Sequence, residues 1–133
     1  MAVRFLDPDN MMKSPAFSQV VTTSGSGKTI YVGGQNAVNE KGETIGRGDI
    51  AAQTEQVMVN IEKALKAAGA TFKDIINMNI YITQGQDIRK GFEASQRFFK
   101  DNANQPVITG LFVAGMGNPD YLMEVEAVAF VEE

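Results

Sequence analysis

The sequence contains no cysteine, no histidine and no tryptophan. Without thiols or imidazoles, the chain cannot use a Cys nucleophile, a His general base, a Ser-His-Asp triad, a disulfide framework or a zinc site of the usual Cys/His type. Acid–base chemistry is therefore left to Asp, Glu, Lys, Tyr, the backbone or bound water.

Long hydrophobic runs and an excess of positive charge are missing as well. No segment approaches the roughly 20 apolar residues of a membrane span, and the N-terminus has no basic stretch followed by an apolar one. We therefore predict a cytoplasmic protein with no membrane partner. Lys and Arg number 12 against 16 Asp and Glu, for a net charge of −4. This balance disfavours nucleic acid as a partner, because surfaces that bind it are usually basic.

The 133 residues, 44% of them hydrophobic, predict a single domain over residues 1–133. Apolar residues at three- and four-residue spacing predict two helices, the first capped by Asp49 and ended by Gly69. Runs of β-prone residues predict the strands. The helices are expected from about Ile50 to Ala68 and from Asp87 to Lys100, and the strands over Val3–Leu6, Phe17–Thr23, Thr29–Gly34, Ile75–Thr83, Val107–Ala114 and Leu122–Val131.

This order of elements favours an α+β domain of two layers, with both helices on one face of a mostly antiparallel sheet. The strand Val107–Ala114 has apolar residues on both of its faces, which predicts burial on both sides. Since two helices cover one face only, we expect other copies of the chain to cover the second face in a homo-oligomer.

The glycine-rich stretch Ser24–Thr29 resembles the end of a phosphate-binding P-loop. The full motif requires a glycine where Thr22 stands, and it must open onto a helix rather than the β-prone residues that follow. We therefore interpret Ser24–Lys28 as the loop of a hairpin between Phe17–Thr23 and Thr29–Gly34.

Two carboxylates, Glu124 and Glu126, interrupt the last apolar strand. Because side chains alternate along a strand, both point to the same face. Two interpretations remain open: a carboxyl group in an apolar pocket that shuttles protons, or a carboxylate held by hydrogen bonds at a subunit contact. The opposite face is entirely apolar and is expected to face the core; it consists of Met123, Val125, Ala127, Ala129 and Val131.

Nearly the whole chain resembles the Rid proteins, also called the YjgF or RidA family and related to proteins named endoribonuclease L-PSP. Each matching stretch is weak singly, but together they are specific, and Met123–Ala129 is close to the most recognisable signature of that family. The other stretches are Pro15–Gln19, Tyr31–Gln35, Val38-Asn39, Gln53-Thr54 and Asn60–Ala70.

The resemblance implies a chorismate-mutase-like α+β fold and a homotrimer with ligand pockets between adjacent subunits. It also implies hydrolysis of a reactive enamine or imine, such as 2-aminoacrylate, to a keto acid and ammonia. A protonated imine is already electrophilic, so such a reaction needs a held water, a proton shuttle and an oriented substrate. No metal and no organic cofactor is required, and the expected partner is a small molecule.

The resemblance also assigns roles to residues. Glu124 matches the carboxyl that positions the attacking water, and the backbone of Gly110 falls at the other contact of that water. Gly34 matches a glycine whose backbone meets the substrate, while Phe17 stands where many members have a pocket tyrosine. Ile108 occupies the place of the arginine that binds the substrate carboxylate. The expected pocket residues are Phe17, Gly34, Ile108, Thr109 and Gly110, with Glu124 as the catalytic residue.

An isoleucine offers a carboxylate no charged or hydrogen-bonding partner, so Ile108 argues against a standard 2-imino-acid deaminase. Two functions stay open: an enzyme that hydrolyses an enamine, an imine or a related metabolite without a buried carboxylate, and a non-catalytic trimer that binds a ligand or a partner. Ribonuclease activity is disfavoured by the acidic charge and the absence of His. The natural substrate and the division of roles between Glu124 and Glu126 are left open.

Overall fold

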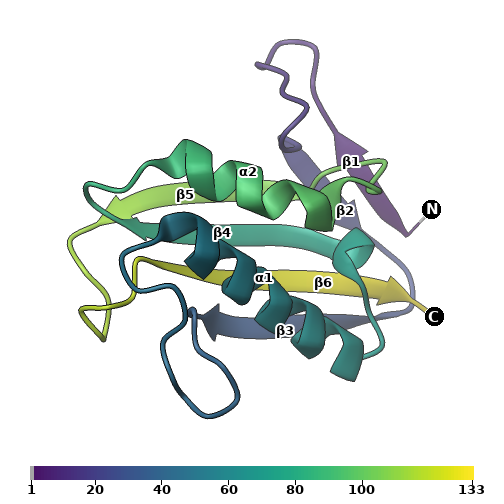
Figure 1. Ribbon diagram of the computed structural model, residues 1–133. Helices are drawn as coiled ribbons and strands as arrows, with labels where there is room; N and C mark the ends of the chain where they lie inside the picture. The colour runs from purple at the N-terminus through teal and green to yellow at the C-terminus, as the bar shows by residue number, and fades with distance from the viewer. Residues whose placement is uncertain (1) are drawn as a thin grey trace.

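The computed structural model describes residues 2–133 as a four-stranded sheet with two helices on one face (Figure 1). A separate two-stranded ribbon lies beside it. The predicted α+β, two-layer fold is therefore confirmed. The strands are β1 (Val3–Leu6), β2 (Val20–Thr23), β3 (Gly27–Gln35), β4 (Ile75–Thr83), β5 (Val107–Val113) and β6 (Met123–Glu132), and the helices are α1 (Ile50–Ala67), α2 (Ile88–Phe99) and a 3-10 turn (Phe72–Asp74).

The order of strands in the main sheet is β3-β6-β4-β5. β6 pairs antiparallel with both β3 and β4, whereas β4 and β5 are parallel. A parallel pair needs a crossover connection, and α2 provides it. The edges of the sheet are therefore β3 on one side and β5 on the other.

Helix α1 begins and ends where the sequence predicts. The Asp49 carboxylate accepts hydrogen bonds from the backbone N–H groups of Ala51 and Ala52, each at 3.1 Å. Gly69 follows the helix with a φ of 81°, a left-handed conformation that a side chain would disfavour. The Lys28 ammonium group donates to the Ala68 carbonyl at the same end, where a positive charge favours the helix dipole.

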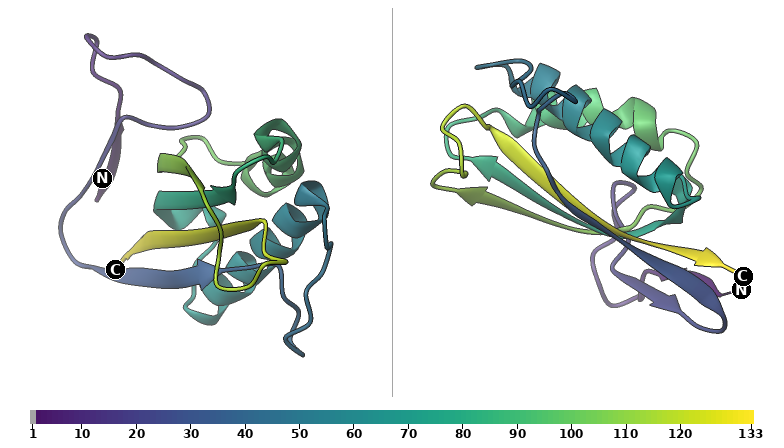
Figure 2. Two further views of the ribbon diagram at one scale, coloured as in Figure 1. Left: turned by 90° about the vertical axis from the view of Figure 1, so that its left-hand side faces the viewer. Right: turned by 90° about the horizontal axis from the view of Figure 1, so that it is seen from below.

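The core lies between the sheet and the helices, which pack on the same side (Figure 2). On β6 the side chains that face this layer are buried: Met123, Val125, Ala127 and Ala129. They meet an apolar stripe of α1 that includes Val57, Met58, Ile61 and Leu65, each at most 1% exposed. This apolar face was predicted from alternation. Burying a large apolar side chain such as Met123 or Val125 contributes about 1.5–3 kcal/mol, and burying an alanine contributes less.

The opposite face of the sheet carries polar and aromatic side chains. Asn79 pairs with Glu126, and Tyr81 pairs with Glu124, so all four point away from the helices. Tyr31 on β3 points to the same side and is 79% exposed. We name this surface the open face.

The predicted hairpin between Phe17–Thr23 and Thr29–Gly34 is wrong. β2 is shorter, starts at Val20 and pairs antiparallel with β1 in the separate ribbon. β3 instead pairs along most of its length with β6, about a hundred positions later. The glycine at the start of β3 matters for this pairing, because a Cβ on Gly27 would overlap the ring of Phe130. The β1–β2 and β3–β6 pairings both join segments that are distant in the sequence, so the turn propensity of Ser24–Lys28 could not predict them.

Candidate functional site

Glu124 lies at the start of β6 on the open face. The side-chain amide of Asn36 donates to its Oε1 atom at 3.1 Å. Its Oε2 atom lies against Gly34 so closely that a Cβ on that glycine would overlap it. The register between β3 and β6 shifts between Val32 and Gln35, which is the bulge that the glycine pair permits. The two oxygens of Glu124 therefore have different surroundings.

Glu126, two residues along the same strand, is held by its own chain. The Tyr81 hydroxyl and the Asn79 amide both donate to its Oε1, at 2.8 Å and 3.0 Å. The hydrogen bond from Tyr81 has the largest effect on the pKa of Glu126, and the bond from Asn79 has the second largest. Together they hold this pKa below its usual range, although burial acts to raise it. The bond from Tyr81 also raises the pKa of Tyr81 itself. Glu126 is thus held by donors from β4 of its own chain, whereas the sequence interpretation placed such a hydrogen-bonded carboxylate at a subunit contact.

A second group of site residues lies at the start of β5. Ser18 donates from its backbone to the Pro106 carbonyl at 3.0 Å and from its hydroxyl to the Gln105 carbonyl at 2.6 Å. These bonds fasten the segment that contains Phe17 beside β5. Ile108 pairs with Met78 and therefore faces the helices.

Two apolar hollows lie between α2 and this part of the sheet. The first has a volume of about 380 Å³ and the second about 350 Å³. They share four lining residues and so adjoin each other. Ile108 lines the first and Gly110 the second. The shared residues are Met78, Ile80, Phe92 and Ser95, and the first hollow is also lined by Pro15, Ala16, Gln96, Phe99, Lys100 and Gln105.

Within one chain, the predicted site residues thus form two groups, and the predicted pocket between subunits stays a prediction. Gly34 and Glu124 come together near the β3 edge, on the open face. Ile108 and Gly110 lie on the β5 edge, on the helix side, with the segment of Phe17 next to them. Thr109 is exposed and belongs to neither group, because it pairs with Asn79 and points to the open face.

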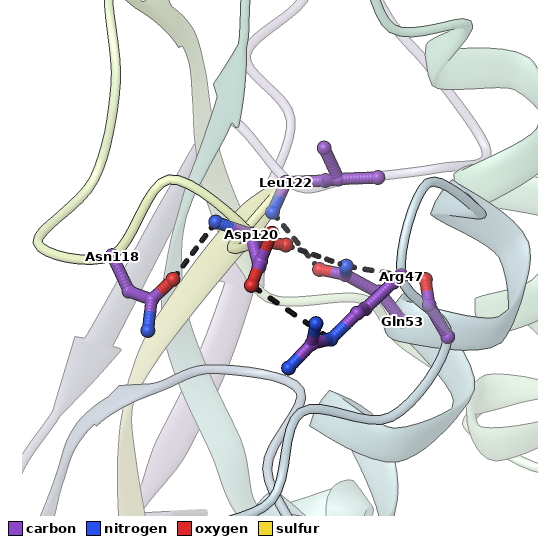
Figure 3. Close-up of polar contacts among 6 residues, drawn as sticks. Arg47, Gln53, Asn118, Asp120 and Leu122 are labelled. Atoms are coloured by element: carbon purple, nitrogen blue, oxygen red, sulfur yellow. Dashed lines mark hydrogen bonds and ion pairs between the residues drawn. The ribbon is translucent and has the colours of Figure 1, made fainter.

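The loop that precedes β6 is fastened to the start of α1 by Gln53 (Figure 3). Its side-chain nitrogen donates to the carbonyls of Gly46 at 3.2 Å and Asp120 at 2.9 Å, and its oxygen accepts from the Leu122 N–H at 2.9 Å. Arg47 and Asp120 add an ion pair at 3.7 Å. Gln53 is fully buried, so these bonds satisfy a side chain that would otherwise be costly in the core. They fix the point at which β6 begins.

Sequence reasoning did not find Asn36 and assigned no role to Gln53. For Gln53 a signal exists, because it stands among the apolar residues of the α1 stripe and a polar residue there must find partners. For Asn36 the only local signal is an amide directly after Gly33-Gly34-Gln35, and its partner is 88 positions away. Residues 2–133 hold no cluster of three His, Cys, Asp or Glu side chains that would suit a metal ion. In the same part of the chain, no helix combines the length and apolar character needed to cross a membrane.

Comparison with known proteins gives matches across the whole domain. The family described as Endoribonuclease L-PSP matches residues 9–131. A RutC family protein of Pyrococcus horikoshii is 32% identical over 107 residues, covering 80% of this chain and 82% of the relative. A 2-iminobutanoate/2-iminopropanoate deaminase of Homo sapiens is 27% identical over 113 residues, covering 85% of this chain and 78% of the relative.

The solved structures agree with these matches. A protein of unknown function of the conserved Rid family from Yersinia pestis is 30% identical, with a TM-score of 0.87. The match covers 98% of this chain and 100% of that one, so it includes both groups of site residues. The fold, the family model and the relatives lead to one conclusion: the chain belongs to the Rid family, which is also described as Endoribonuclease L-PSP.

Proposed function

We propose that this chain forms a homotrimer that hydrolyses a small enamine or imine without a carboxylate group, with Glu124 as the catalytic residue. The observation that supports this most is the Glu124 carboxylate itself. One oxygen is held by Asn36, and among residues 2–133 no hydrogen-bond donor reaches the other, which lies above Gly34. A fixed carboxylate with one oxygen available is suited to accept a proton from water.

The position of the two groups of site residues supports an assembly. They lie toward opposite edges of the sheet, so one chain does not bring the two groups together. Contact between the β5 edge of one copy and the β3–β6 side of the next would join the halves. Three copies in a closed ring give three equal contacts of this kind. Leu111 and Phe112 on β5 are 53% and 54% exposed, and burying them in such a contact is favourable.

The chemistry follows from the residues available. In the proposed reaction, water attacks the carbon of a protonated imine while Glu124 takes one proton from that water. The resulting carbinolamine receives that proton from Glu124 on its nitrogen, and Glu124 then takes the hydroxyl proton as the C–N bond breaks and a carbonyl compound and ammonia form. The ammonia leaves with the proton held by Glu124, so one protonated imine and one water give one carbonyl compound and one ammonium ion. An enamine enters the same route after protonation on carbon.

The substrate class follows from Ile108. The human relative is named for 2-iminobutanoate and 2-iminopropanoate, which both carry a carboxylate. Here the lining of the hollow beside Ile108 is mostly apolar and the cation in that lining, Lys100, is exposed, so a carboxylate placed against Ile108 has no charged partner at that position and its desolvation is costly. A neutral imine with an apolar substituent avoids this cost, so we propose that substrate class.

The test uses imines made in situ with a semicarbazide trap. An amino-acid oxidase supplies 2-imino acids, and a flavin amine oxidase supplies imines without a carboxylate. We expect the purified protein to reduce the trapped product only for the second class. Glu124→Gln should abolish this effect, whereas Glu132→Gln, on the same strand and exposed, should keep it. Full activity of Glu124→Gln would overturn the catalytic assignment.

Ile108→Arg tests the substrate assignment separately. The arginine gives the pocket a bidentate partner for carboxylates. We expect the variant to reduce trapped semicarbazone from 2-imino acids and to lose activity on the neutral substrate. Ile45→Arg, on a loop away from both hollows, is the matched control. Binding of a neutral ligand without turnover of any imine would instead favour a non-catalytic trimer.

A further inference from the structure

Asn36 lies directly after β3, where the chain leaves the sheet and turns toward α1. Its side-chain nitrogen donates to two acceptors, the Met123 carbonyl at 3.3 Å and Glu124 Oε1 at 3.1 Å. Both acceptors of this amide nitrogen therefore belong to the first two residues of β6. The hydrogen bond to Glu124 is charge-assisted, which makes it stronger than a bond between neutral groups.

Asn36 is itself held in place from the helix layer. Asn60 on α1 donates to the carbonyls of Asn36 at 3.1 Å and Val38 at 2.9 Å. Gln56, one turn earlier, donates to the side-chain oxygen of Asn60 at 2.9 Å and so fixes its orientation. A continuous series of hydrogen bonds thus runs from α1 through Asn36 to the carboxylate of Glu124.

The other oxygen of Glu124, Oε2, lies against the backbone of β3 at Gly34. Gly34 has no Cβ, and the space that a Cβ would fill is occupied by Oε2. No donor among residues 2–133 reaches that atom. Oε1 is thus restrained by Asn36, and Oε2 is the oxygen that stays free of protein donors among residues 2–133.

We propose that Asn36 is a positioning residue that selects Oε2 of Glu124 as the atom that takes the proton of the attacking water. The inference rests on the proposed function. It adds a residue that does not touch the substrate and acts through the carboxylate. Without the amide, Glu124 rotates about its side-chain bonds, and the fraction of molecules with the productive orientation falls.

Three variants test this inference. Asn36→Leu keeps a similar volume without a donor, Asn36→Ala removes the group without adding apolar bulk, and Asn36→His restores a donor at the position of the amide. We expect the first two to lower kcat about 10- to 100-fold with KM changed less than about threefold, as for the loss of one hydrogen bond to a charged group. Asn36→His should recover part of kcat. Circular dichroism at rising temperature checks that each variant is folded.

A structural measurement decides the inference even if no imine is turned over. In a crystal structure of the wild type, we expect the Glu124 side chain in one orientation. In a crystal structure of Asn36→Ala, we expect it in several orientations. The same single orientation in both would overturn the positioning role. If Glu124→Gln abolishes turnover while Asn36→Leu keeps kcat, the positioning role alone is wrong. If Glu124→Gln keeps turnover, the proposed function is wrong.

Discussion

The backbone at Gly33 and Gly34 decides where the candidate carboxylate lies. The two glycines are neighbours, yet their surroundings differ. A Cβ at position 34 would overlap the Glu124 carboxylate, whereas a Cβ at position 33 would have nothing within 4 Å. Adding one methyl group at position 34 would therefore displace the Glu124 carboxylate, whereas the same methyl group at position 33 would contact nothing.

We predict that Gly34→Ala lowers kcat at least about tenfold while the free energy of unfolding changes by less than about 1 kcal/mol. The reason is that only the flexible end of Glu124 has to move, so the fold tolerates the methyl group but the carboxylate leaves its place. Steady-state kinetics and urea denaturation measure the two quantities. Gly33→Ala is the control, and an equal loss of kcat in both variants would contradict the prediction.

The individual site residues differ in how far the sequence reveals them. Glu124 stands out because a charge interrupts an apolar strand, and Gly34 because glycine pairs permit close approach. Ile108 was found through the family pattern, which implies a pocket between adjacent subunits that contains it together with Glu124; within one chain the two residues face opposite sides of the sheet. Asn36 was missed, because an amide in a loop is unremarkable until its distant partner is known.

Among the elements, α1 carries the connection between the helix layer and the site. Its buried stripe includes Gln53 and Thr54, whose polar atoms meet the chain just before and at the start of β6. Thr54 donates to its own helix at the Ile50 carbonyl and lies 3.0 Å from the sulfur of Met123. The helix thus fixes the position of β6 by polar contacts as well as by apolar packing.

Gln53→Leu should lower the free energy of unfolding by about 3 kcal/mol. The leucine fits a similar volume but leaves the Leu122 N–H and the carbonyls of Gly46 and Asp120 without their partner. Urea denaturation at one fixed protein concentration gives this value. The exposed Gln96→Leu on α2 should change it by less than about 0.5 kcal/mol. A similar small change for Gln53→Leu would show that the loop finds other partners.

The helices were predicted well because their signals are local. Asp49 caps α1 and Gly69 ends it as expected, and α2 begins directly after Asp87, whose carboxylate accepts from the Arg89 N–H. The strands were also found, but the partner of β3 was not. Pairing between strands far apart in the chain depends on the layer that covers them, and no window of the sequence contains that information.

For the molecule as a whole, the open face and the β5 edge are two of the surfaces that one chain leaves uncovered. The sequence predicted an assembly because β5 is apolar on both faces, and that assembly stays a prediction. Leu111 points to the open face and Phe112 to the helix side, and both remain half exposed in the single chain. An apolar edge strand of this kind is a risk for aggregation unless it is covered.

We therefore predict that light scattering gives three times the 14.4 kDa mass of one chain. Leu111→Lys should shift the protein to monomers, because a charge replaces an apolar contact at the proposed interface. Met12→Lys, on an exposed loop, is the control and should leave the mass unchanged. A wild-type monomer would refute the interface, and with it the joining of the two groups of site residues.

The place of β6 in the sheet has a consequence for how the protein is made. β6 comes after every other strand in the chain, yet it lies between β3 and β4 and pairs with both. During translation, β3 and β4 therefore emerge from the ribosome well before the strand that joins them. Until then β4 lacks its neighbour β6 and the sheet is incomplete, so we expect the nascent chain to stay open to chaperones until β6 is released.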